Sequence, residues 1–559
     1  MNKCEYDAIK SELIIGNELF SKLIPNVTNV KSEQVKSRLP EPYLKITAER
    51  NFKKNIYCIW DNLPVIHIID CNEDELEKLN GEHWHIKAVK LNAFTDECDT
   101  LTVDTEHELF QKNLYECYGE IFFLENIENG DAVVIISETP DYQTTTMSIK
   151  AGAVKVDNGG NPITVGYCRS GECEALCRNY YRHAKKCEGL VTMSNTWGDC
   201  NGFSRVCEDF VLKEIDVAEE IGVDIVQIDD GWQTGNTADK SLRDELNRRI
   251  FNGDFWELDS NKFPKGMKHI TDYAAEKSIK VGMWFAPDSH DEYALLERDI
   301  NVLKKAYNEW GIRFFKLDMY WIMSNTEKDC FLKLLNKIHS FGDDVSVQLD
   351  VTRNLRINYL CGHKYGTVFV ENRYTKSANS FPHRVLRNLW MISKYIPSSK
   401  FQFELINPDL NKECYGENDP FAPALYDMDY LFATVMLSNP LFWMEMQYLS
   451  DERKTQLKKI MNVWKEHRVS LANADVMPIG DKPSGRSFTG FYISNKGKPE
   501  YLLLFREVTE ENSTMIKCPV KSANIEILAT NSHAEVEINN GFINAKFSKP
   551  RSYAFIKIL

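Results

Sequence analysis

The stretch Arg313-Phe-Phe-Lys-Leu-Asp-Met319 has the pattern of a short strand in which apolar residues alternate with two charged ones. In an extended strand, Lys316 and Asp318 lie on the same face, two residues apart. Burying an ammonium group beside a carboxylate costs hydration free energy unless the two groups are paired or bind a ligand. The stretch therefore predicts either a functional site at a strand end or an ordinary salt bridge.

Seven further strand patterns accompany this one, and amphipathic helical patterns lie between most of them. The eight predicted strands are 191–197, 224–230, 280–287, 313–319, 346–352, 367–372, 401–407 and 441–446. The predicted helices include 208–221, 265–278, 293–310, 328–340, 382–395 and 426–437. This alternation predicts an α/β fold, a (β/α)8 barrel. An open doubly wound sheet is the alternative, but it usually carries a glycine-rich first turn, which this sequence lacks.

The chain on either side of the barrel reads mainly as strands. In the first 165 residues the clearest strand patterns are 55–60, 65–69, 120–124 and 132–137, whereas 6–23 is expected to be a helix or a poorly ordered lead-in. After a predicted helix at 451–467, strand patterns return at 486–494, 500–505, 525–529, 534–538 and 552–558. We therefore expect an N-terminal β-sandwich (1–165), a linker helix (166–189), the barrel (190–470) and a C-terminal β-sandwich (471–559).

Charge and composition narrow the classes of partner. The net charge of −15 disfavours nucleic acid and anionic membranes, which need concentrated Lys and Arg, and suits a neutral ligand better. The N-terminus lacks a basic region followed by an apolar run, and no apolar segment of about 18 residues follows. We therefore expect a cytoplasmic protein without a membrane partner, and the sequence is compatible with a homo-oligomer.

Fifteen cysteines are then expected to be mostly free thiols. The densest group is Cys168, Cys173, Cys177 and Cys187, and a zinc site is one interpretation of it. Its spacings match no common zinc finger, and Cys173 and Cys177 fall four apart on a predicted helix. Buried thiols are the favoured interpretation.

Polar or aromatic side chains occupy the carboxyl ends of the predicted strands, where barrels of this kind build their sites. In chain order they are Asn195 and Trp197; Asp229, Asp230 and Trp232; Trp284; Lys316 and Asp318; Asp350; Glu371, Asn372 and Arg373; Glu404 and Asn407; and Glu445. A purely structural barrel has no reason to gather so many carboxylates at one edge. The collective pattern favours an active site over a set of unrelated salt bridges.

Two chemistries use a carboxylate-rich barrel mouth: divalent metal catalysis and glycoside hydrolysis. Metal catalysis often adds histidine, and no histidine falls at a predicted strand end. Tryptophans do, at Trp197, Trp232, Trp284 and Trp321. Because indole rings pack on the apolar faces of sugars, the mixture favours a carbohydrate substrate, although core packing is the better explanation of each ring alone. We expect neither a metal ion nor an organic cofactor.

Four motifs resemble the successive motifs of melibiase-type α-galactosidases, glycoside hydrolase family 36 with its relative family 27. They are Asn195-Thr-Trp-Gly-Asp199, Gln227-Ile-Asp-Asp-Gly-Trp232, Gly282-Met-Trp-Phe-Ala-Pro287 and Phe315-Lys-Leu-Asp318. The resemblance spans about residues 190–375. Flanking sandwiches also fit family 36, although this N-terminal region is shorter than is usual there.

The resemblance implies a role for each matching residue. Asp318 is the implied nucleophile, and Lys316 an implied ligand of a sugar hydroxyl. Asp229 and Asp230 are implied to hold the 4- and 6-hydroxyls, while Trp232 and Trp284 wall the pocket. The charges agree, because Lys316 beside Asp318 stabilises the ionised carboxylate that a nucleophile needs.

The general acid/base is expected at Glu371, in Val370-Glu-Asn-Arg373, where the resembled family has an Asp. This role requires a pKa held up by burial or by the charge of Asp318. Arg373 opposes that shift if its guanidinium points inward, so we expect it to point elsewhere or to pair with Asp350. Glu is one methylene longer than Asp, which moves the point of proton delivery.

Two further departures concern the pocket wall. The family's Cys-Ser-x-Gly-Gly-Gly-Arg type stretch is replaced by Gln348-Leu-Asp-Val-Thr-Arg-Asn-Leu-Arg356, in which Asp350, Arg353 and Arg356 are candidate binding groups or a solvated charge cluster. Ala286 stands where the family commonly has Glu. Substrate choice is therefore expected to differ from plain α-galactosides.

Together these features predict a retaining, exo-acting glycoside hydrolase that removes terminal α-galactosyl residues by double displacement. α-N-Acetylgalactosaminidase and α-galactosyltransferase activities are alternatives on the same scaffold, and the predicted insertion at 233–263 could supply an acceptor site. A non-catalytic sugar-binding protein and a metal-dependent hydrolase are alternatives of other classes.

Overall fold

The computed structural model divides the chain into two compact units. The first comprises Met1–Ala93, Leu101–Lys186 and Asn354–Lys364, and the second Phe94–Thr100, Cys187–Arg353 and Tyr365–Leu559. The described residues are 4–7, 12–15, 18–21, 28–35, 43–49, 53–60, 64–68, 74–76, 84–92, 102–111, 115–126, 130–137, 145–150, 153–157, 163–184, 189–198, 204–350, 365–370 and 373–559.

Antiparallel strands in three sheets make up most of the first unit. The largest sheet has the order β10 (Val103–Gln111), β9 (Trp84–Leu91), β12 (Ile121–Asn126), β13 (Asp131–Ser137), β16 (Ile163–Arg169), β7 (Pro64–Ile68), β6 (Lys53–Trp60), β5 (Tyr43–Glu49) and β4 (Thr28–Val35). The second has the order β11 (Tyr115–Tyr118), β14 (Thr146–Lys150), β15 (Ala153–Asp157) and β8 (Asp74–Leu76). Helix α1 (Cys173–Ala184) follows β16. The four strands predicted most clearly correspond to β6, β7, β12 and β13.

The third sheet overturns the helical prediction for 6–23. This stretch contributes to β1 (Cys4–Asp7), β2 (Glu12–Ile15) and β3 (Glu18–Ser21), which pair antiparallel in that order. The physical reason is local: the β-branched pair Ile14-Ile15 favours extended backbone, and two short connections are enough to return an antiparallel strand.

Eight parallel strands close into a barrel in the second unit, as predicted. They are β17 (Met193–Asn195), β18 (Ile225–Ile228), β19 (Lys280–Phe285), β20 (Phe314–Leu317), β21 (Ser346–Asp350), β22 (Gly366–Phe369), β23 (Phe401–Leu405) and β24 (Asn439–Phe442). β24 pairs with β17 and thereby closes the ring. Each strand overlaps one predicted segment.

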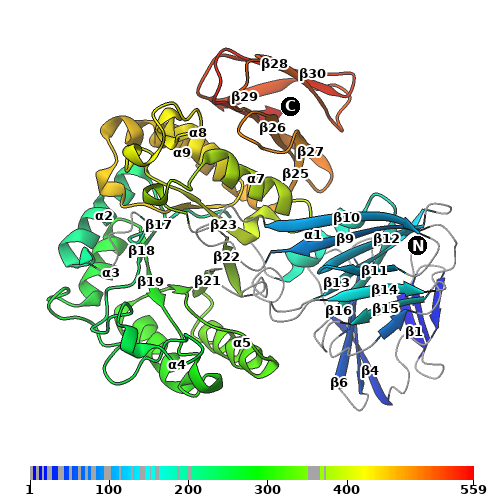
Figure 1. The fold of residues 1–559 in the computed structure, drawn as a ribbon, viewed down its shortest axis with the longest axis horizontal. Coiled ribbons are helices and arrows are strands. Elements are labelled where there is room, and N and C mark those ends of the chain that lie inside the picture. Colours follow the sequence, from blue (N-terminus) through cyan, green and yellow to red (C-terminus); the bar gives the residue numbers. More distant parts are fainter. Residues whose placement is uncertain are drawn as a thin grey trace. The chain divides into compact units, whose positions relative to one another are not determined.

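Helices surround this barrel (Figure 1). They are α2 (Glu208–Ile221), α3 (Met267–Glu276), α4 (Leu296–Lys305), α5 (Asn325–His339), α7 (Pro382–Ile392), α8 (Met428–Val435) and α9 (Asp451–Asn473). α2 shows why they form: its apolar stripe, including Phe210, Val211 and Ile215, is buried, and Gly222 ends the helix in a left-handed conformation at φ 94°.

Two helix boundaries differ from the prediction for local reasons. α5 starts three residues earlier than predicted, because the Ser324 hydroxyl accepts from the Glu327 N–H and caps the helix. α4 starts at Leu296 instead of 293, since Asp291, Glu292 and Tyr293 all have positive φ. It ends at Lys305, where a π-helical turn over Ala306–Trp310 takes its place.

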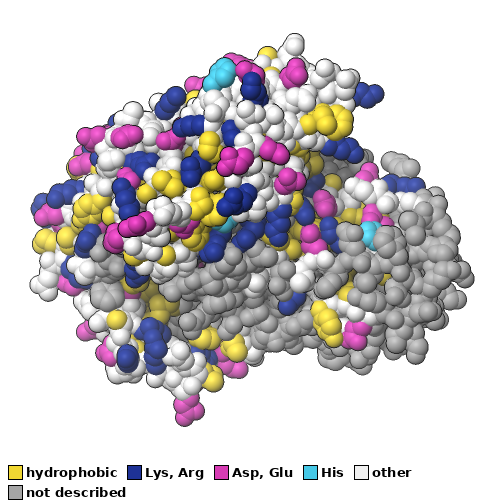
Figure 2. Space-filling view, turned by 45° about the horizontal axis from the view of Figure 1, so that its top comes forward, with side chains coloured by type: hydrophobic (Ala, Val, Ile, Leu, Met, Phe, Trp, Pro, Cys, Tyr) yellow, Lys and Arg dark blue, Asp and Glu magenta, His cyan; other side chains and the backbone are white. Residues whose placement is uncertain are grey.

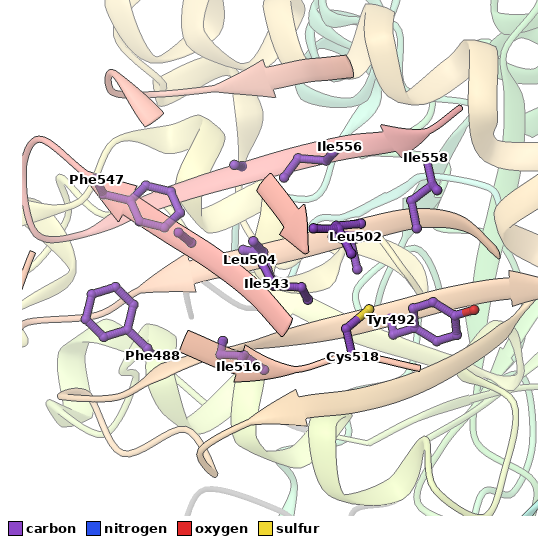
Figure 3. Close-up of a cluster of buried hydrophobic side chains, with 13 residues drawn as sticks. Phe488, Tyr492, Leu502, Leu504, Ile516, Cys518, Ile543, Phe547, Ile556 and Ile558 are labelled. Atoms are coloured by element: carbon purple, nitrogen blue, oxygen red, sulfur yellow. The ribbon is translucent and has the colours of Figure 1, made fainter. Parts of the chain in front are cut away.

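Two antiparallel sheets pack together at the C-terminus. One has the order β25 (Asp475–Gly480), β26 (Phe488–Asn495), β27 (Lys498–Arg506), β32 (Ser552–Ile558) and β29 (Ile525–Thr530), and the other β28 (Ser513–Lys517), β31 (Phe542–Phe547) and β30 (Ala534–Asn539). Figure 3 shows side chains of both, among them Leu502, Leu504 and Ile543, in one apolar cluster. The flanking sheets agree with the predicted sandwiches, while the boundaries at 165, 189 and 470 stay predictions.

The face of the molecule drawn in Figure 2 carries both acidic and basic side chains among its described residues. In Figure 2 the basic and acidic side chains are interspersed over the view of the molecule. Among the described residues, no helix has the length and apolar character needed to cross a membrane.

Candidate active site

Lys316 of β20 lies at the centre of a buried charge cluster at the barrel mouth. Its Nζ is 3.0 Å from Asp229 Oδ2, 3.1 Å from Asp350 Oδ2 and 3.7 Å from Asp318 Oδ2. The same atom lies 4.9 Å from the centre of the Trp443 ring. The side chain of Lys316 is only 2% exposed. The predicted pairing of Lys316 with Asp318 is therefore present, and the ammonium group is shared with two more carboxylates.

The protonation of Lys316 follows from two opposing effects. Burial by itself lowers the pKa of an ammonium group, because the charged form loses hydration. The carboxylates of Asp229, Asp350 and Asp318 outweigh burial and hold the pKa of Lys316 above its usual value. Lys316 is therefore a cation throughout the physiological pH range and offers fixed N–H donors at the mouth.

Asp229 is held by neighbouring strands. Its Oδ2 accepts from Asn195 Nδ2 at 2.6 Å as well as from Lys316, and its backbone N–H donates to Thr196 Oγ1 at 2.9 Å. Its Oδ1 accepts from the Asp230 N–H at 2.9 Å. Gly231 has φ 120°, a conformation that side chains rarely adopt, which explains the glycine in the Asp-Asp-Gly-Trp motif.

The side-chain donors to Asp230 are neutral groups, whereas Asp229 pairs with Lys316. Asp230 Oδ1 accepts from Gln233 Nε2 at 2.6 Å, and its Oδ2 accepts from the Thr237 hydroxyl. Burial raises the pKa of Asp230 to about 6, against the lowering effect of these two hydrogen bonds, and the charges of Asp229 and Asp318 raise it further. The two adjacent aspartates are thus in different electrostatic environments.

Asp318 is oriented by two N–H donors. The Met319 N–H donates to Oδ1 at 2.6 Å, and Trp284 Nε1 donates to Oδ2 at 3.0 Å. Met319 has φ 54°, a strained conformation for a residue with a side chain, and it lies directly after the carboxylate that it binds. The Asp318 side chain is 14% exposed, more than Asp229 or Asp350. The most accessible carboxylate of the cluster is therefore the predicted nucleophile.

Two of the predicted tryptophans, Trp284 and Trp232, form a buried layer next to the Asp318 carboxylate. Trp232 Nε1 donates to the Trp284 carbonyl at 2.9 Å, and the Trp232 ring stacks on Trp256 at 5.8 Å between ring centres. Both Trp232 and Trp284 are fully buried. Trp197 is half-buried and packs against the apolar cluster that contains Trp443. A direct contact of these rings with a sugar stays a prediction.

The remaining predicted residues divide into described and masked positions. Asp350 lies in the cluster around Lys316. Arg373 is fully buried, and its backbone N–H donates to both carboxylate oxygens of Glu404 at 3.1 and 3.2 Å. Glu371, Arg353 and Arg356 lie outside the described residues. Their roles stay predictions.

Three residues of the site were missed from the sequence: Gln233, Thr237 and Trp443. Gln233 and Thr237 hold Asp230 from an irregular loop, where no periodic pattern marks them. Trp443 was recognisable in principle, because it lies on the same face of a predicted strand as Leu441 and Glu445. The signal for Trp443 was therefore the register of the eighth strand.

The cysteine group gives no metal site among the residues that can be described. Cys168 Sγ and Cys173 Sγ lie 3.7 Å apart, and both side chains are buried free thiols. Cys187 is outside the described residues. Across the described ranges, no group of three His, Cys, Asp or Glu is arranged to hold a metal ion.

Part of the sequence matches a known protein family, and nearly the whole chain matches a known fold. Residues 174–314 match the Melibiase family. α-Galactosidase Mel36A of Lactobacillus acidophilus is 36% identical over 81 residues, which is 14% of this chain and 10% of that protein. α-Galactosidase 1 of Pediococcus pentosaceus is 35% identical over 74 residues, 13% of this chain and 9% of that protein. The matched part thus spans about a tenth of the length of these curated relatives.

The solved structures extend the likeness to nearly the whole chain. The family 36 α-galactosidase AgaA of Geobacillus stearothermophilus superposes with a TM-score of 0.63 at 11% identity, covering 95% of this chain and 87% of that one. An α-galactosidase of Lactobacillus brevis gives a TM-score of 0.64 at 10% identity, with 95% and 85% covered. The chain therefore has the fold of family 36 α-galactosidases, and its barrel carries melibiase-like sequence.

Proposed function

We propose that this protein is a retaining, exo-acting glycoside hydrolase that removes terminal α-galactosyl residues. The observation that carries the proposal is the setting of Asp318. This carboxylate is the most exposed of the buried charge cluster, is oriented by Trp284 and the Met319 N–H, and lies at a strand end directly after the melibiase-like segment. A fixed, ionised carboxylate beside a permanent cation is what a glycosidase nucleophile requires.

The proposed reaction has two displacements. Asp318 attacks the anomeric carbon while Glu371 donates its proton to the glycosidic oxygen, so that the aglycone leaves as an alcohol and a covalent glycosyl-enzyme forms. Glu371, now a carboxylate, then takes a proton from water, and the water oxygen displaces Asp318. The product is a free sugar that keeps its original anomeric configuration. In retaining enzymes the two carboxyl groups stand about 5 to 5.5 Å apart.

The charge cluster also suits the binding of a neutral sugar. The Asp229 and Asp230 carboxylates can accept hydrogen bonds from hydroxyls, and Lys316 can donate to one. Variants of the structurally similar AgaA have been crystallised with raffinose and stachyose. We propose that oligosaccharides ending in an α-galactosyl unit are the substrates of this chain as well.

The test compares leaving groups in Glu371→Gln. The wild type should hydrolyse raffinose and an aryl α-galactoside with an activated leaving group, and the first product observed by NMR should be the α-anomer. Glu371→Gln should lose about 10²- to 10⁴-fold in kcat on raffinose, because that aglycone needs a proton to leave. On the activated aryl substrate its glycosylation step should be far less impaired. Glu417→Gln, at an exposed glutamate, is the matched control.

Four outcomes contradict the proposal. Equal impairment of Glu371→Gln on both substrates removes it as general acid, and first formation of the β-anomer removes the retaining mechanism. Activity on aryl α-N-acetylgalactosaminides with none on α-galactosides moves the enzyme to that alternative class. Binding of galactosides without turnover on any glycoside identifies a sugar-binding protein.

A further inference from the structure

The insertion between β18 and α3 carries a small hairpin whose two ends are arginines. Arg243 and Arg249 form an antiparallel β-bridge. Between them, the Asn247 N–H donates to the Asp244 carbonyl at 2.9 Å, and Asn247 adopts φ 62°. The Asp244 N–H in turn donates to the Arg248 carbonyl at 3.0 Å. These contacts give the hairpin a defined register, so that consecutive side chains point to opposite sides.

Arg248 fixes one side of the hairpin to the barrel. Its Nη1 donates to the Ser289 carbonyl at 2.9 Å and to Glu327 Oε1 at 2.8 Å, and its Nε donates to Asp244 Oδ2 at 3.1 Å. Ser289 follows β19, and Glu327 lies in the first turn of α5, which follows β20. Because the Arg248 side chain is only 11% exposed, this anchor is a buried one. The hairpin is therefore held over the ends of two barrel strands.

The next residue, Arg249, belongs to the same insertion as Gln233 and Thr237, which bind Asp230 directly. Its guanidinium interacts electrostatically with Asp230 and Asp318, which raise its pKa, whereas burial, the larger effect, and the charge of Arg243 lower that pKa overall. Its Nη1 is buried and makes no hydrogen bond within the described part of the chain. No ion pair of this side chain is found there either. Arg249 thus keeps one buried, unused donor in the insertion that holds Asp230, and it interacts electrostatically with Asp230 and Asp318.

We propose that Arg249 is a substrate-binding residue whose Nη1 donates a hydrogen bond to a hydroxyl of the terminal sugar, between Asp230 and Asp318. A buried N–H without an acceptor is costly, and a sugar hydroxyl in this position satisfies it. The inference rests on the proposed function and deepens it, because it names a donor that no strand end and no resembled motif supplies. The consequence is selection for sugars that carry this hydroxyl, since a site built around a hydrogen bond rejects the analogue that lacks it.

The experiment pairs arginine variants with deoxy sugars. Arg249→Gln and Arg249→Lys are assayed on an aryl α-galactoside and on its 2-, 3-, 4- and 6-deoxy forms. Arg249→Gln should lower kcat/KM on the parent at least about tenfold. On one deoxy substrate the same substitution should have almost no further effect, because both partners of the bond are then missing. Arg249→Lys should not restore activity, since its ammonium group does not reproduce the planar guanidinium fork.

Arg243→Gln is the matched control, because Arg243 lies on the same hairpin, is exposed and donates to Asn247 instead of the site. It should stay within about twofold of the wild type, and urea midpoints of all variants should agree. Loss by the same factor on the parent and on all four deoxy substrates overturns the inference. The inference is also overturned if Arg249→Lys keeps full activity and Arg249→Gln only shifts the pH profile, because that pair of results identifies an effect of the positive charge alone. A wild type inactive on every α-galactoside removes the proposed function together with this inference, whereas an active wild type and an unaffected Arg249→Gln remove the inference alone.

Discussion

Replacing Lys316 by Met should destabilise the barrel strongly and in a pH-dependent way. The ammonium group lies 3.0 and 3.1 Å from Asp229 and Asp350, whose side chains are 3% and 1% exposed. Methionine fills a similar volume without the charge, so these carboxylates stay buried without their cation. Removing one partner of a buried ion pair costs about 3 to 5 kcal/mol, so the unfolding equilibrium at pH 7 should change by roughly two to four orders of magnitude.

The pH dependence of this loss has a definite sign. In the wild type, the raised pKa of Lys316 keeps its contribution present at all pH values below its unfolded pKa of about 10.5, so this group changes nothing between pH 5 and 8. In Lys316→Met the bare carboxylates bind protons more tightly when folded than when unfolded. The variant should therefore gain stability as the pH falls, and its deficit should be smaller at pH 5 than at pH 8.

The assay is urea unfolding followed by tryptophan fluorescence at pH 5, 6.5 and 8. All tryptophans except Trp60 and Trp84 lie between Trp197 and Trp464, so the signal reports mainly on the barrel. Lys277→Met is the control, because Lys277 pairs with Glu219 at the surface, where ion pairs contribute little. A Lys316→Met deficit below about 1 kcal/mol at pH 7, or one equal at pH 5 and pH 8, would refute this account of the cluster.

Two further predictions concern neighbours of the cluster. Asp230→Asn should abolish sugar binding yet stabilise the fold at pH 7 in urea titrations. Burial raises the pKa of Asp230 to about 6, so the wild-type protein loses stability as the pH rises from about 4 to above 6. The amide of the variant does not ionise and removes that loss. A variant less stable than the wild type at pH 7, or a gain that persists at pH 3.5, contradicts this. Arg248→Ala should leave Glu327 buried without its cation and loosen the insertion. The hydrogen-exchange rates of residues 233–263 should then rise by at least about tenfold, while those of α9 stay unchanged. Unchanged protection there removes Arg248 as the anchor.

The barrel and one face of its site were predictable because both follow from short-range periodicity. The alternation in Arg313-Phe-Phe-Lys-Leu-Asp-Met319 places Lys316 and Asp318 on one face, and the structure has them 3.7 Å apart at Nζ and Oδ2. The partners on other strands were not predictable as pairs. Asp229 and Asp350 meet Lys316 only because the barrel closes with a particular stagger between strands, which a single sequence does not state.

Errors occurred where the local pattern was weak. The strands β25, β28 and β31 were missed, and in β28 the side chain of Met515 is 65% exposed, so apolar alternation does not mark the buried face. α9 continues six residues beyond its predicted end at His467, because no glycine or proline follows His467 before Pro478, and Arg468 within the extension pairs with Asp224 at 2.7 Å. Boundaries set by tertiary pairs of this kind cannot be derived from local sequence.

The substitution at Ala286, after the third barrel strand, and the insertion after the second strand are structurally connected. Ala286 stands where the resembled motif commonly has Glu, and the nearby carboxylate, Asp288, is turned to the insertion: its Oδ2 accepts from the Phe251 N–H at 3.1 Å. Arg298 binds the Phe251 carbonyl and lies 3.7 Å from Asp288. The carboxylate that follows the third strand therefore holds the segment that contains Arg249. If the insertion supplies a sugar ligand, exchanging Ala286 for Glu should not simply restore a family-like pocket, because the new carboxylate would attract the Arg249 guanidinium away from the sugar.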